Sequence, residues 1–474
     1  MGKKPRSERR NGKKASGKRG KDEEEEEVLP DDFTILGSDD GGTVFGIDDW
    51  ETGNANGIDE EGEDDEDGDE TTQLEKNLEK FRDVLANVED GIGGEKAGRK
   101  RESGFKLLFR TLTHYALGPS GVEIMEAFEG SVVPTVLASL KNSASEQYAA
   151  CRVIEAIAVV LGGGNDAFFE LVEPALKRVV MATGNQAQVR AAGLRAWSLA
   201  AFVCSTDFPS TIVLLDLCEA AANERYRGED SSPLLRAAAL DSWSLLATTI
   251  EDNDIASEEG RGPTILPLLQ KALDSDSAEL RSSAGECVAM IHEARLNLGV
   301  QDEDATATTR RYRRGSWDGT EFEVLIDEVK QRMAELAAES GHHMSKKAKK
   351  SQRSTFREYM STLVDDENPV VTVAFRGGTL ELKTWKEVIQ LGAIRSCCQG
   401  GFMLQMSNNE YLQEIFGADV SVLNNGDGMS NIEKRMLLSK NSQASKDKDR
   451  EMNKDRKKRS NVKNYFLDAD GEDI

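Results

Sequence analysis

Three stretches of the chain share one pattern: VRAAGLRAWSLA (189–200), LRAAALDSWSLL (235–246) and LRSSAGECVAMI (280–291). Arg190, Arg236 and Arg281 align at steps of 46 and 45 residues, and Trp197 aligns with Trp243. A helical pattern that returns every 40–47 residues is typical of HEAT and armadillo repeats, in which each repeat is a pair of helices. The sequence therefore predicts a helical-repeat fold.

The repeat pattern extends on both sides of these stretches. A helix that starts at Gln147 fits the same register 42 residues earlier, and shorter helical segments such as ELVEPALKRVV and TILPLLQKAL precede the copies. One helix pair cannot bury its apolar stripe alone, so neighbouring pairs must stack into a continuous core. We expect this array over residues 72–300, with no strand inside it. Its tryptophans and cysteines should fill the core, and its aligned arginines should form caps or pairs between repeats.

A different pattern follows the repeats. Residues 301–351 read as one helix with basic linkers, and residues 352–420 read as a small α+β C-terminal domain. In that domain FREYMSTLV predicts a helix, and VVTVAF and TLELKT predict a β-hairpin whose turn contains Gly377 and Gly378. The segments WKEVIQLGAIRSCC and SNNEYLQEIF predict two further helices. The fold class is therefore mainly α, with one small sheet.

Charge separates both ends of the chain from this folded part. The 474 residues carry a net charge of −25, and 38% of them are apolar, fewer than in a compact globular chain. Residues 1–21 hold ten Lys or Arg, while residues 22–70 hold 23 Asp or Glu and no base. Near the C-terminus, residues 440–463 carry a net charge of +6. We expect residues 1–71 to be a disordered basic then acidic tail, and residues 421–474 to be a basic C-terminal arm.

The usual signatures of catalysis and of metal or cofactor binding are missing from the sequence. There is no P-loop, no G-x-S-x-G and no H-E-x-x-H, and we interpret Gly162, Gly163 and Gly164 as a helix end and a turn. The six cysteines lie mostly in apolar helical patterns without a C-x-x-C pair, which argues against disulfides and zinc. No apolar run reaches the roughly 18 residues that span a bilayer. We therefore expect a soluble intracellular protein that is not an enzyme, with no cofactor, metal, membrane or small-molecule substrate.

Four motifs near the C-terminus follow one another in an order that resembles the interferon-related developmental regulator family. They are FREYMSTLV, LELKTW, QGGFMLQMSNNEYLQEIF and EKRMLLSKNSQASKDKDREMNKDRKKR. The resemblance covers about residues 72–466, weakly in the repeats and more specifically from Phe356 onward. Where the family usually has a histidine after the Gly-Gly-Phe stretch, this chain has Gln405. If that histidine makes a specific contact, the contact is altered here.

The resemblance implies a non-enzymatic regulator that binds ribosomes, through rRNA and ribosomal proteins, and represses translation or holds ribosomes inactive. The arm would neutralise rRNA phosphates, and the repeats would offer a concave surface to a ribosomal protein or to the rRNA backbone. The candidate RNA-binding residues of the arm are Lys434, Arg435, Lys440, Lys446, Lys448, Arg450, Lys454, Arg456, Lys457, Lys458, Arg459 and Lys463. A second patch consists of Lys346, Lys347, Lys349, Lys350 and Arg353.

The alternative is a nuclear transcriptional co-regulator scaffold. Basic clusters in residues 3–21 resemble a bipartite nuclear-import signal, and the acidic tract holds short apolar islands suited to docking on a partner. The first reading predicts a cytoplasmic protein, and the second predicts one that also enters the nucleus and joins co-regulator complexes.

Overall fold

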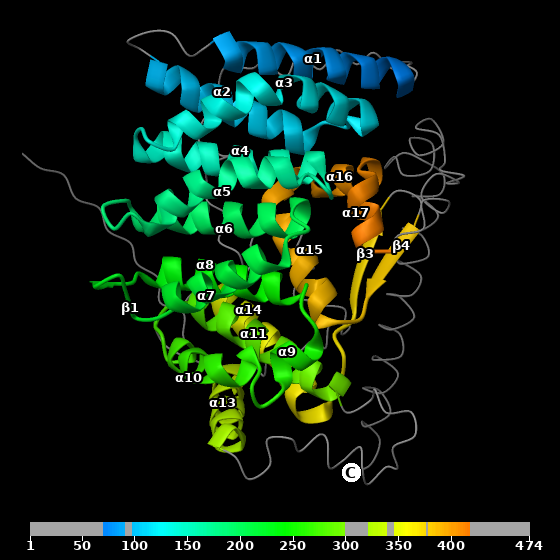
Figure 1. The fold of residues 1–474 in the computed structure, drawn as a ribbon. Coiled ribbons are helices and arrows are strands. Elements are labelled where there is room, and N and C mark those ends of the chain that lie inside the picture. The colour runs from blue at the N-terminus through cyan, green and yellow to red at the C-terminus, as the bar shows by residue number, and fades with distance from the viewer. Residues whose placement is uncertain (1–69, 91–96, 299–320, 339–345, 376–377, 418–474) are drawn as a thin grey trace, which may run out of the picture. The chain divides into compact units, whose positions relative to one another are not determined.

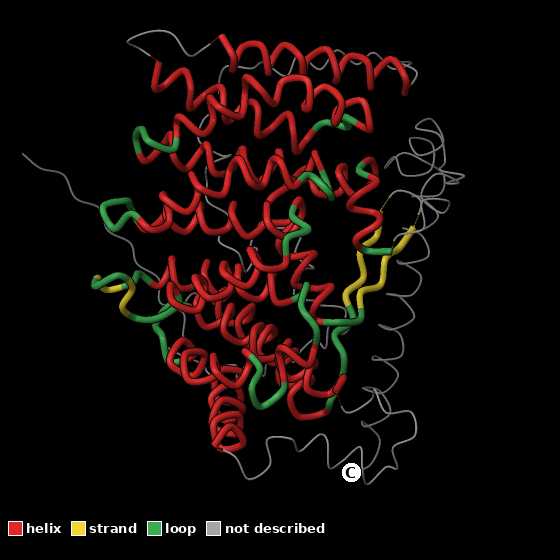
Figure 2. Tube along the Cα trace, viewed as in Figure 1, coloured by secondary structure: helices red, strands yellow, loops and turns green. Residues whose placement is uncertain are grey.

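Helices dominate the computed structural model, which describes residues 70–90, 97–298, 321–338, 346–375 and 378–417 (Figures 1 and 2). The mainly α fold is therefore confirmed. The N-terminal tail and the C-terminal arm, which we expect to be disordered, lie outside the described residues. None of the described helices is long and apolar enough to cross a lipid bilayer.

The described helices form six pairs. The first helix of each pair is called outer here: α1 (Glu70–Asp90), α3 (Gly118–Ser139), α5 (Asp166–Met181), α7 (Phe208–Ala221), α10 (Arg261–Leu273) and α13 (Glu321–Ala338). The second is called inner: α2 (Ala97–His114), α4 (Ala144–Leu161), α6 (Ala187–Cys204), α8 (Pro233–Ala247), α11 (Ala278–Leu298) and α14 (Lys346–Asp365). A short helix, α9 (Asp252–Ala256), connects α8 to α10.

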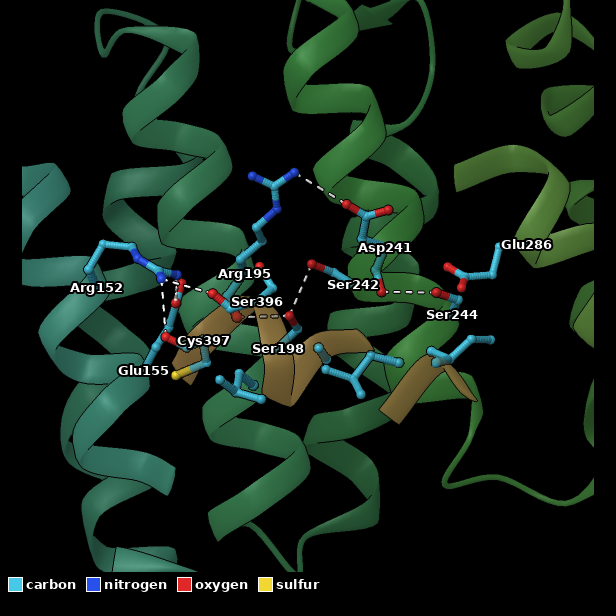
Figure 3. Close-up of a pocket in the computed structure, with 14 residues that line it drawn as sticks. Arg152, Glu155, Arg195, Ser198, Asp241, Ser242, Ser244, Glu286, Ser396 and Cys397 are labelled. Carbon is cyan, nitrogen blue, oxygen red and sulfur yellow. Dashed lines mark hydrogen bonds and ion pairs between the residues drawn. The ribbon is translucent and has the colours of Figure 1, made fainter. Parts of the chain in front are cut away.

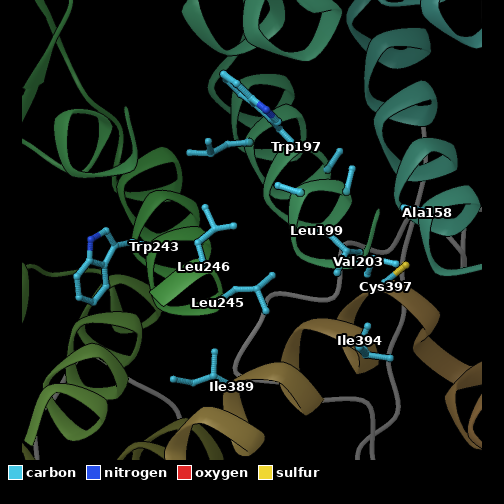
Figure 4. Packing of buried hydrophobic residues seen from close by; sticks show 14 of the residues in the cluster. Ala158, Trp197, Leu199, Val203, Trp243, Leu245, Leu246, Ile389, Ile394 and Cys397 are labelled. Carbon is cyan, nitrogen blue, oxygen red and sulfur yellow. The ribbon is translucent and has the colours of Figure 1, made fainter. Parts of the chain in front are cut away.

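Each outer helix packs on its inner partner, and the inner helices contact one another in chain order from α2 to α14. This succession of pairs confirms the predicted helical repeats. Trp197 on α6 and Trp243 on α8 are fully buried, as expected for core residues (Figure 4). Because α4, α6, α8 and α11 have neighbours on almost every side, most of their residues are buried, and many of these are alanines that let the backbones approach closely.

Local sequence explains where several helices begin. Ser143 precedes α4 and accepts a hydrogen bond from the backbone N–H of Glu146, and Ser232 precedes α8 and accepts one from Leu235. Pro233 occupies the first turn of α8, where its missing N–H costs no helical hydrogen bond. Such caps satisfy the orphan N–H groups that every helix exposes at its start.

A small hairpin inside the repeats contradicts the expectation of no strand there. Strands β1 (Arg225–Tyr226) and β2 (Glu229–Asp230) pair between α7 and α8. Their two-residue turn consists of Arg227 and Gly228, with φ values of 55° and 86°. Two successive residues of positive φ form the tight turn preferred in hairpins, and four paired residues are too few to leave a strand pattern in the sequence.

Most C-terminal elements agree with their sequence patterns, but residues 402–408 form a further helix that we did not expect, and the segment SNNEYLQEIF is broken at Asn409. Strands β3 (Val371–Phe375) and β4 (Gly378–Leu382) form the expected antiparallel hairpin, with Val373 opposite Leu380. Helix α15 (Trp385–Cys398) coincides with WKEVIQLGAIRSCC, and a 3-10 turn (Gln399–Gly401), α16 (Phe402–Asn408) and α17 (Glu410–Ile415) follow it. The FREYMSTLV helix is part of α14, which starts at Lys346 and packs on α11 and α13. The basic stretch before FREYMSTLV therefore belongs to a helix rather than to a linker.

Candidate functional site

The predicted RNA-binding residues divide between two regions. All twelve candidates of the arm lie outside the described residues. The second patch lies in the first half of α14, and of its five residues only Arg353 has a described side chain, which is half-buried. The described residues therefore place the backbone of the second patch and leave the arm outside.

A row of charged side chains crosses the inner helices. Arg152 on α4, Arg195 on α6, Asp241 on α8 and Glu286 on α11 are separated by 43, 46 and 45 residues and line one cavity (Figure 3). They therefore occupy one repeat position in four successive copies. The offset of 43 for the first copy differs by one residue from the spacing of 42 expected from the sequence.

Two ion-pair groups stabilise this row. The Arg152 guanidinium pairs with Glu155 one turn further along α4. On the next helices, Nη2 of Arg195 lies 3.2 Å from Oδ2 of Asp241 and 3.0 Å from Oε1 of Glu279. These pairs link α6 to both α8 and α11, so the charges connect three consecutive repeats.

Burial dominates the electrostatics of the carboxyl groups in this row. It raises the pKa of Glu286 to about 8, and the nearby negative charge of Asp241 adds to the rise. Burial also raises the pKa of Glu155 and Asp241, while the neighbouring guanidinium groups act in the opposite direction. For Arg195, burial opposes the charged form, but the attraction of Asp241 and Glu279 outweighs it and the pKa is raised. Arg195 is therefore charged at neutral pH, and the environment of Glu286 favours its protonated form.

The cavity itself has a volume of about 40 Å³. A buried water needs roughly 10–15 Å³ of such space, so two or three waters fit, whereas sites for drug-sized ligands measure hundreds of Å³. Three of its polar atoms have no hydrogen-bond partner among the residues that the structure describes: Oε1 of Glu155, Nε of Arg195 and Oδ1 of Asp241. Waters that bridge these donors and acceptors would satisfy all of them. The cavity therefore suits ordered water rather than a substrate.

The aligned arginines act as caps, as expected. Nε of Arg190 donates to the Val180 carbonyl at the end of α5, and Nε of Arg236 donates to the Ala222 carbonyl just after α7. Arg281 repeats this contact with Ser275, just after α10. In the first copy, Gln147 donates to the Leu140 carbonyl at the end of α3. Each of these four inner helices, α4, α6, α8 and α11, thus satisfies an orphan carbonyl at the end of its outer partner.

The C-terminal elements cover part of the inner face of the repeats. Helix α15 contacts α2, α4, α8 and α11, and its Ile389 and Ile394 lie among buried side chains of α6 and α8 such as Leu199 and Leu245 (Figure 4). Nη2 of Arg152 donates to the carbonyl of Ser396 near the end of α15, at 3.0 Å. This part of the inner face, which we expected to receive a partner, is therefore occupied by the chain's own residues.

The sequence contains one signal for the charged row. The seventh residue of the three aligned stretches is Arg195, Asp241 or Glu286, a charge inside an otherwise apolar or small pattern. A charge that returns at a core-facing position indicates a polar contact between repeats. No comparable signal marks α15 as the element that covers this row, because that contact joins residues more than 240 positions apart.

Comparison with known proteins identifies the family. The sequence model of the family described as "Interferon-related developmental regulator (IFRD)" matches residues 51–364, which include the six helix pairs except the last residue of α14. The chain belongs to the interferon-related developmental regulator family. The family indicated by the sequence is thus confirmed, and the matched region lies in the repeats, where we expected the weaker likeness, rather than in the C-terminal motifs after residue 364.

Individual relatives are similar over much of the chain at low identity. Interferon-related developmental regulator 2 of Mus musculus is 25% identical over 359 residues, covering 74% of this chain and 75% of that protein. Interferon-related developmental regulator 1 of Homo sapiens is 22% identical over 342 residues, covering 69% and 70%. The match to interferon-related developmental regulator 1 of Mus musculus is 23% identical and spans 59% of that protein. These relatives are named as regulators.

Proposed function

We propose that this member of the interferon-related developmental regulator family is a non-enzymatic regulator that binds ribosomes and represses translation or holds ribosomes inactive. The observation that carries the proposal is the basic arm, which follows directly after helices that pack on the repeats. Residues 440–463 hold ten Lys or Arg and four acids, and a run of this charge neutralises phosphates and releases counterions. The repeats and α15–α17 are the folded support of the arm.

The partners in this proposal are rRNA and ribosomal proteins, and the location is cytoplasmic. Family membership supports a regulatory role. The water-sized cavity among Arg152, Arg195 and Asp241 fits a structural role for the charged row. The RNA contacts would be made by the arm and by the basic start of α14, where Lys346 and Lys347 lie.

Sucrose-gradient sedimentation of cell lysate tests the proposal. The full-length protein should comigrate with monosomes at low salt and dissociate at about 0.5 M salt, and a truncation ending at Asn425 should stay at the top of the gradient. If the full-length protein also stays at the top, under starvation as well as growth, ribosome binding is excluded. Nuclear residence would then favour the second candidate, a co-regulator scaffold, which the basic and acidic N-terminal segments support.

Matched charge variants sharpen the test. The first variant replaces five basic residues of the arm by glutamine: Lys454, Arg456, Lys457, Lys458 and Arg459. The slope of the logarithm of the RNA-binding constant against the logarithm of the salt concentration should become shallower by roughly 3–4, because each lost phosphate contact on single-stranded RNA accounts for about 0.7. The opposite change neutralises the four acids of the same segment and should tighten binding. It consists of D447N, D449N, E451Q and D455N. Equal affinities for both variants would show that arm charge does not govern binding.

A further inference from the structure

Side chains of residues 385–416 make a repeated kind of contact with the repeats. They donate hydrogen bonds to backbone carbonyls at the C-terminal ends of successive inner helices. The last four carbonyls of a helix have no partner within the helix and need one from elsewhere. We call residues 385–416 the clamp.

The contacts follow the chain order of the helices. Nε2 of Gln405 lies 3.0 Å from the carbonyl oxygens of both Leu112 and Thr113, in the last turn of α2. Nδ2 of Asn409 donates to Val159 in the last turn of α4, also at 3.0 Å. Tyr411 donates its hydroxyl proton to Val203 near the end of α6, at 3.0 Å.

The other end of the clamp contacts α8 and α11 through hydrogen bonds of more varied kinds. Nε2 of Gln390 donates to the Thr248 hydroxyl, and Nζ of Lys386 donates to the Ile250 carbonyl, both just beyond α8. The backbone N–H of Trp385 lies 2.8 Å and 2.9 Å from the two carboxylate oxygens of Glu293 on α11. Five successive inner helices are thus tied to one continuous segment.

Glycines allow this close approach on both sides of the interface. A Cβ atom at Gly401 would overlap the carbonyl oxygen of Thr113, so only glycine lets the turn before α16 reach α2. On the repeat side, Gly162 ends α4 with a φ of 73°, and a Cβ at Gly163 would lie 2.7 Å from the ring of Tyr411. The Gly-Gly-Phe stretch and the Gly162–Gly164 turn therefore have the same purpose, which is to let the clamp touch the helix ends.

From these contacts we propose that the clamp fixes the relative positions of the inner helices and so holds the origin of the C-terminal arm. Stacked repeats contact only their neighbours, so small changes between pairs add up along an array. A segment that bonds α2, α4, α6, α8 and α11 together removes this freedom. Because α17 is the last element of the clamp, Asn409 and Tyr411 are positioning residues for the arm. The positioning of the arm rests on the proposed function of the arm. The proposal that the clamp fixes the inner helices relative to one another does not depend on that function.

Spin-label distances in the full-length protein test the proposal. The six native cysteines are buried, so labels can be directed to exposed cysteines introduced by E126C on α3 and K271C on α10. The unmodified clamp should give one narrow distance distribution. The G401A substitution should at least double its width and should speed amide exchange in α16 and α17 at least tenfold. The control G130A, at an exposed glycine with open space around it, should change neither.

A milder variant covers the case in which G401A does not fold. The Y411F substitution removes only the hydroxyl that donates to Val203, and it should speed exchange in α17 and in the last turn of α6 several-fold. Distances and exchange rates equal to those of the unmodified protein in both variants would overturn the clamp. Failure of ribosome binding by the full-length protein would overturn the proposed function of the arm and leave these readouts unaffected, so the two failures are distinguishable.

Discussion

The stability of the contact between Gln405 and α2 can be worked out from the structure. The Gln405 amide is buried, and its two protons face three carbonyl oxygens, those of Leu112, Thr113 and Tyr115, at 3.0, 3.0 and 3.1 Å. The Q405A substitution would leave two carbonyls without a donor, and each buried unsatisfied group costs roughly 1–3 kcal/mol. We therefore expect a loss of about 2–6 kcal/mol in the free energy of unfolding.

Thermal unfolding measures this loss. An unfolding entropy of roughly 2.1 cal/mol/K for each of about 310 ordered residues corresponds to about 1.5 °C per kcal/mol, so the Tm of Q405A should fall by about 3–9 °C. The control is Q270A, which removes the same side chain where it makes one partly exposed hydrogen bond to Glu328, and its Tm should change by less than about 1 °C. A drop in Q405A no larger than in Q270A would refute the assignment of Gln405 as a helix cap.

The histidine variant addresses the departure from the family pattern. A neutral imidazole offers one N–H donor where the amide of Gln405 offers two, so Q405H should recover about half of the stability lost in Q405A. In Q405E, a carboxylate would face the negative end of α2 and its carbonyls, so this variant should be less stable than Q405A at neutral pH. A Q405E protein as stable as the unmodified one would contradict this electrostatic argument.

Two further predictions concern the repeats. Trp243 donates to Glu219, whereas the indole N–H of Trp197 has no partner among the described residues, so W243F should destabilise the protein by about 1 kcal/mol more than W197F in denaturant unfolding; equal losses would contradict this. The second concerns pH. Because burial and Asp241 raise the pKa of Glu286 to about 8, above roughly 4.3 in the unfolded chain, the folded state binds its proton more tightly, and stability should fall as pH rises from about 4.3 to 8. The fall in the free energy of unfolding with pH should be smaller in E286Q than in the unmodified protein, by up to about 1.4 kcal/mol per pH unit. Identical profiles of Tm against pH for the two proteins would refute this prediction.

The sequence predicted the elements that depend on local patterns. The spacing of Arg190, Arg236 and Arg281 located the inner helices, because each arginine repeats one capping contact with the preceding helix. The period-two pattern around Gly377 and Gly378 located the hairpin of β3 and β4, and Thr384 with Glu387 forms the capping box that starts α15. In each of these cases the determining contacts lie within one repeat or one turn.

The clamp could not be predicted in the same way. Gln405 lies in a short helix and Asn409 lies between two, and what gives these ordinary polar residues a role is the set of carbonyls on α2 and α4, at least 250 residues earlier. Nothing in a periodic pattern encodes such a pairing. The charged row is an intermediate case: its members occupy one repeat position, but whether Arg195 meets solvent or Asp241 depends on how the repeats stack.

The clamp also has a consequence for the order of folding. Arrays of helix pairs usually fold fast, since their contacts are local in sequence and no long loop must close. Here the segment that joins the inner helices is synthesised after all of them, and Gln405 meets Leu112 across 293 residues. The inner apolar face of the repeats therefore stays uncovered until the clamp has been synthesised. Aggregation and chaperone binding are most favoured during this interval. Substitutions in the clamp such as G401A should accordingly lower the yield of soluble protein in cells by more than the measured loss of free energy of unfolding would predict.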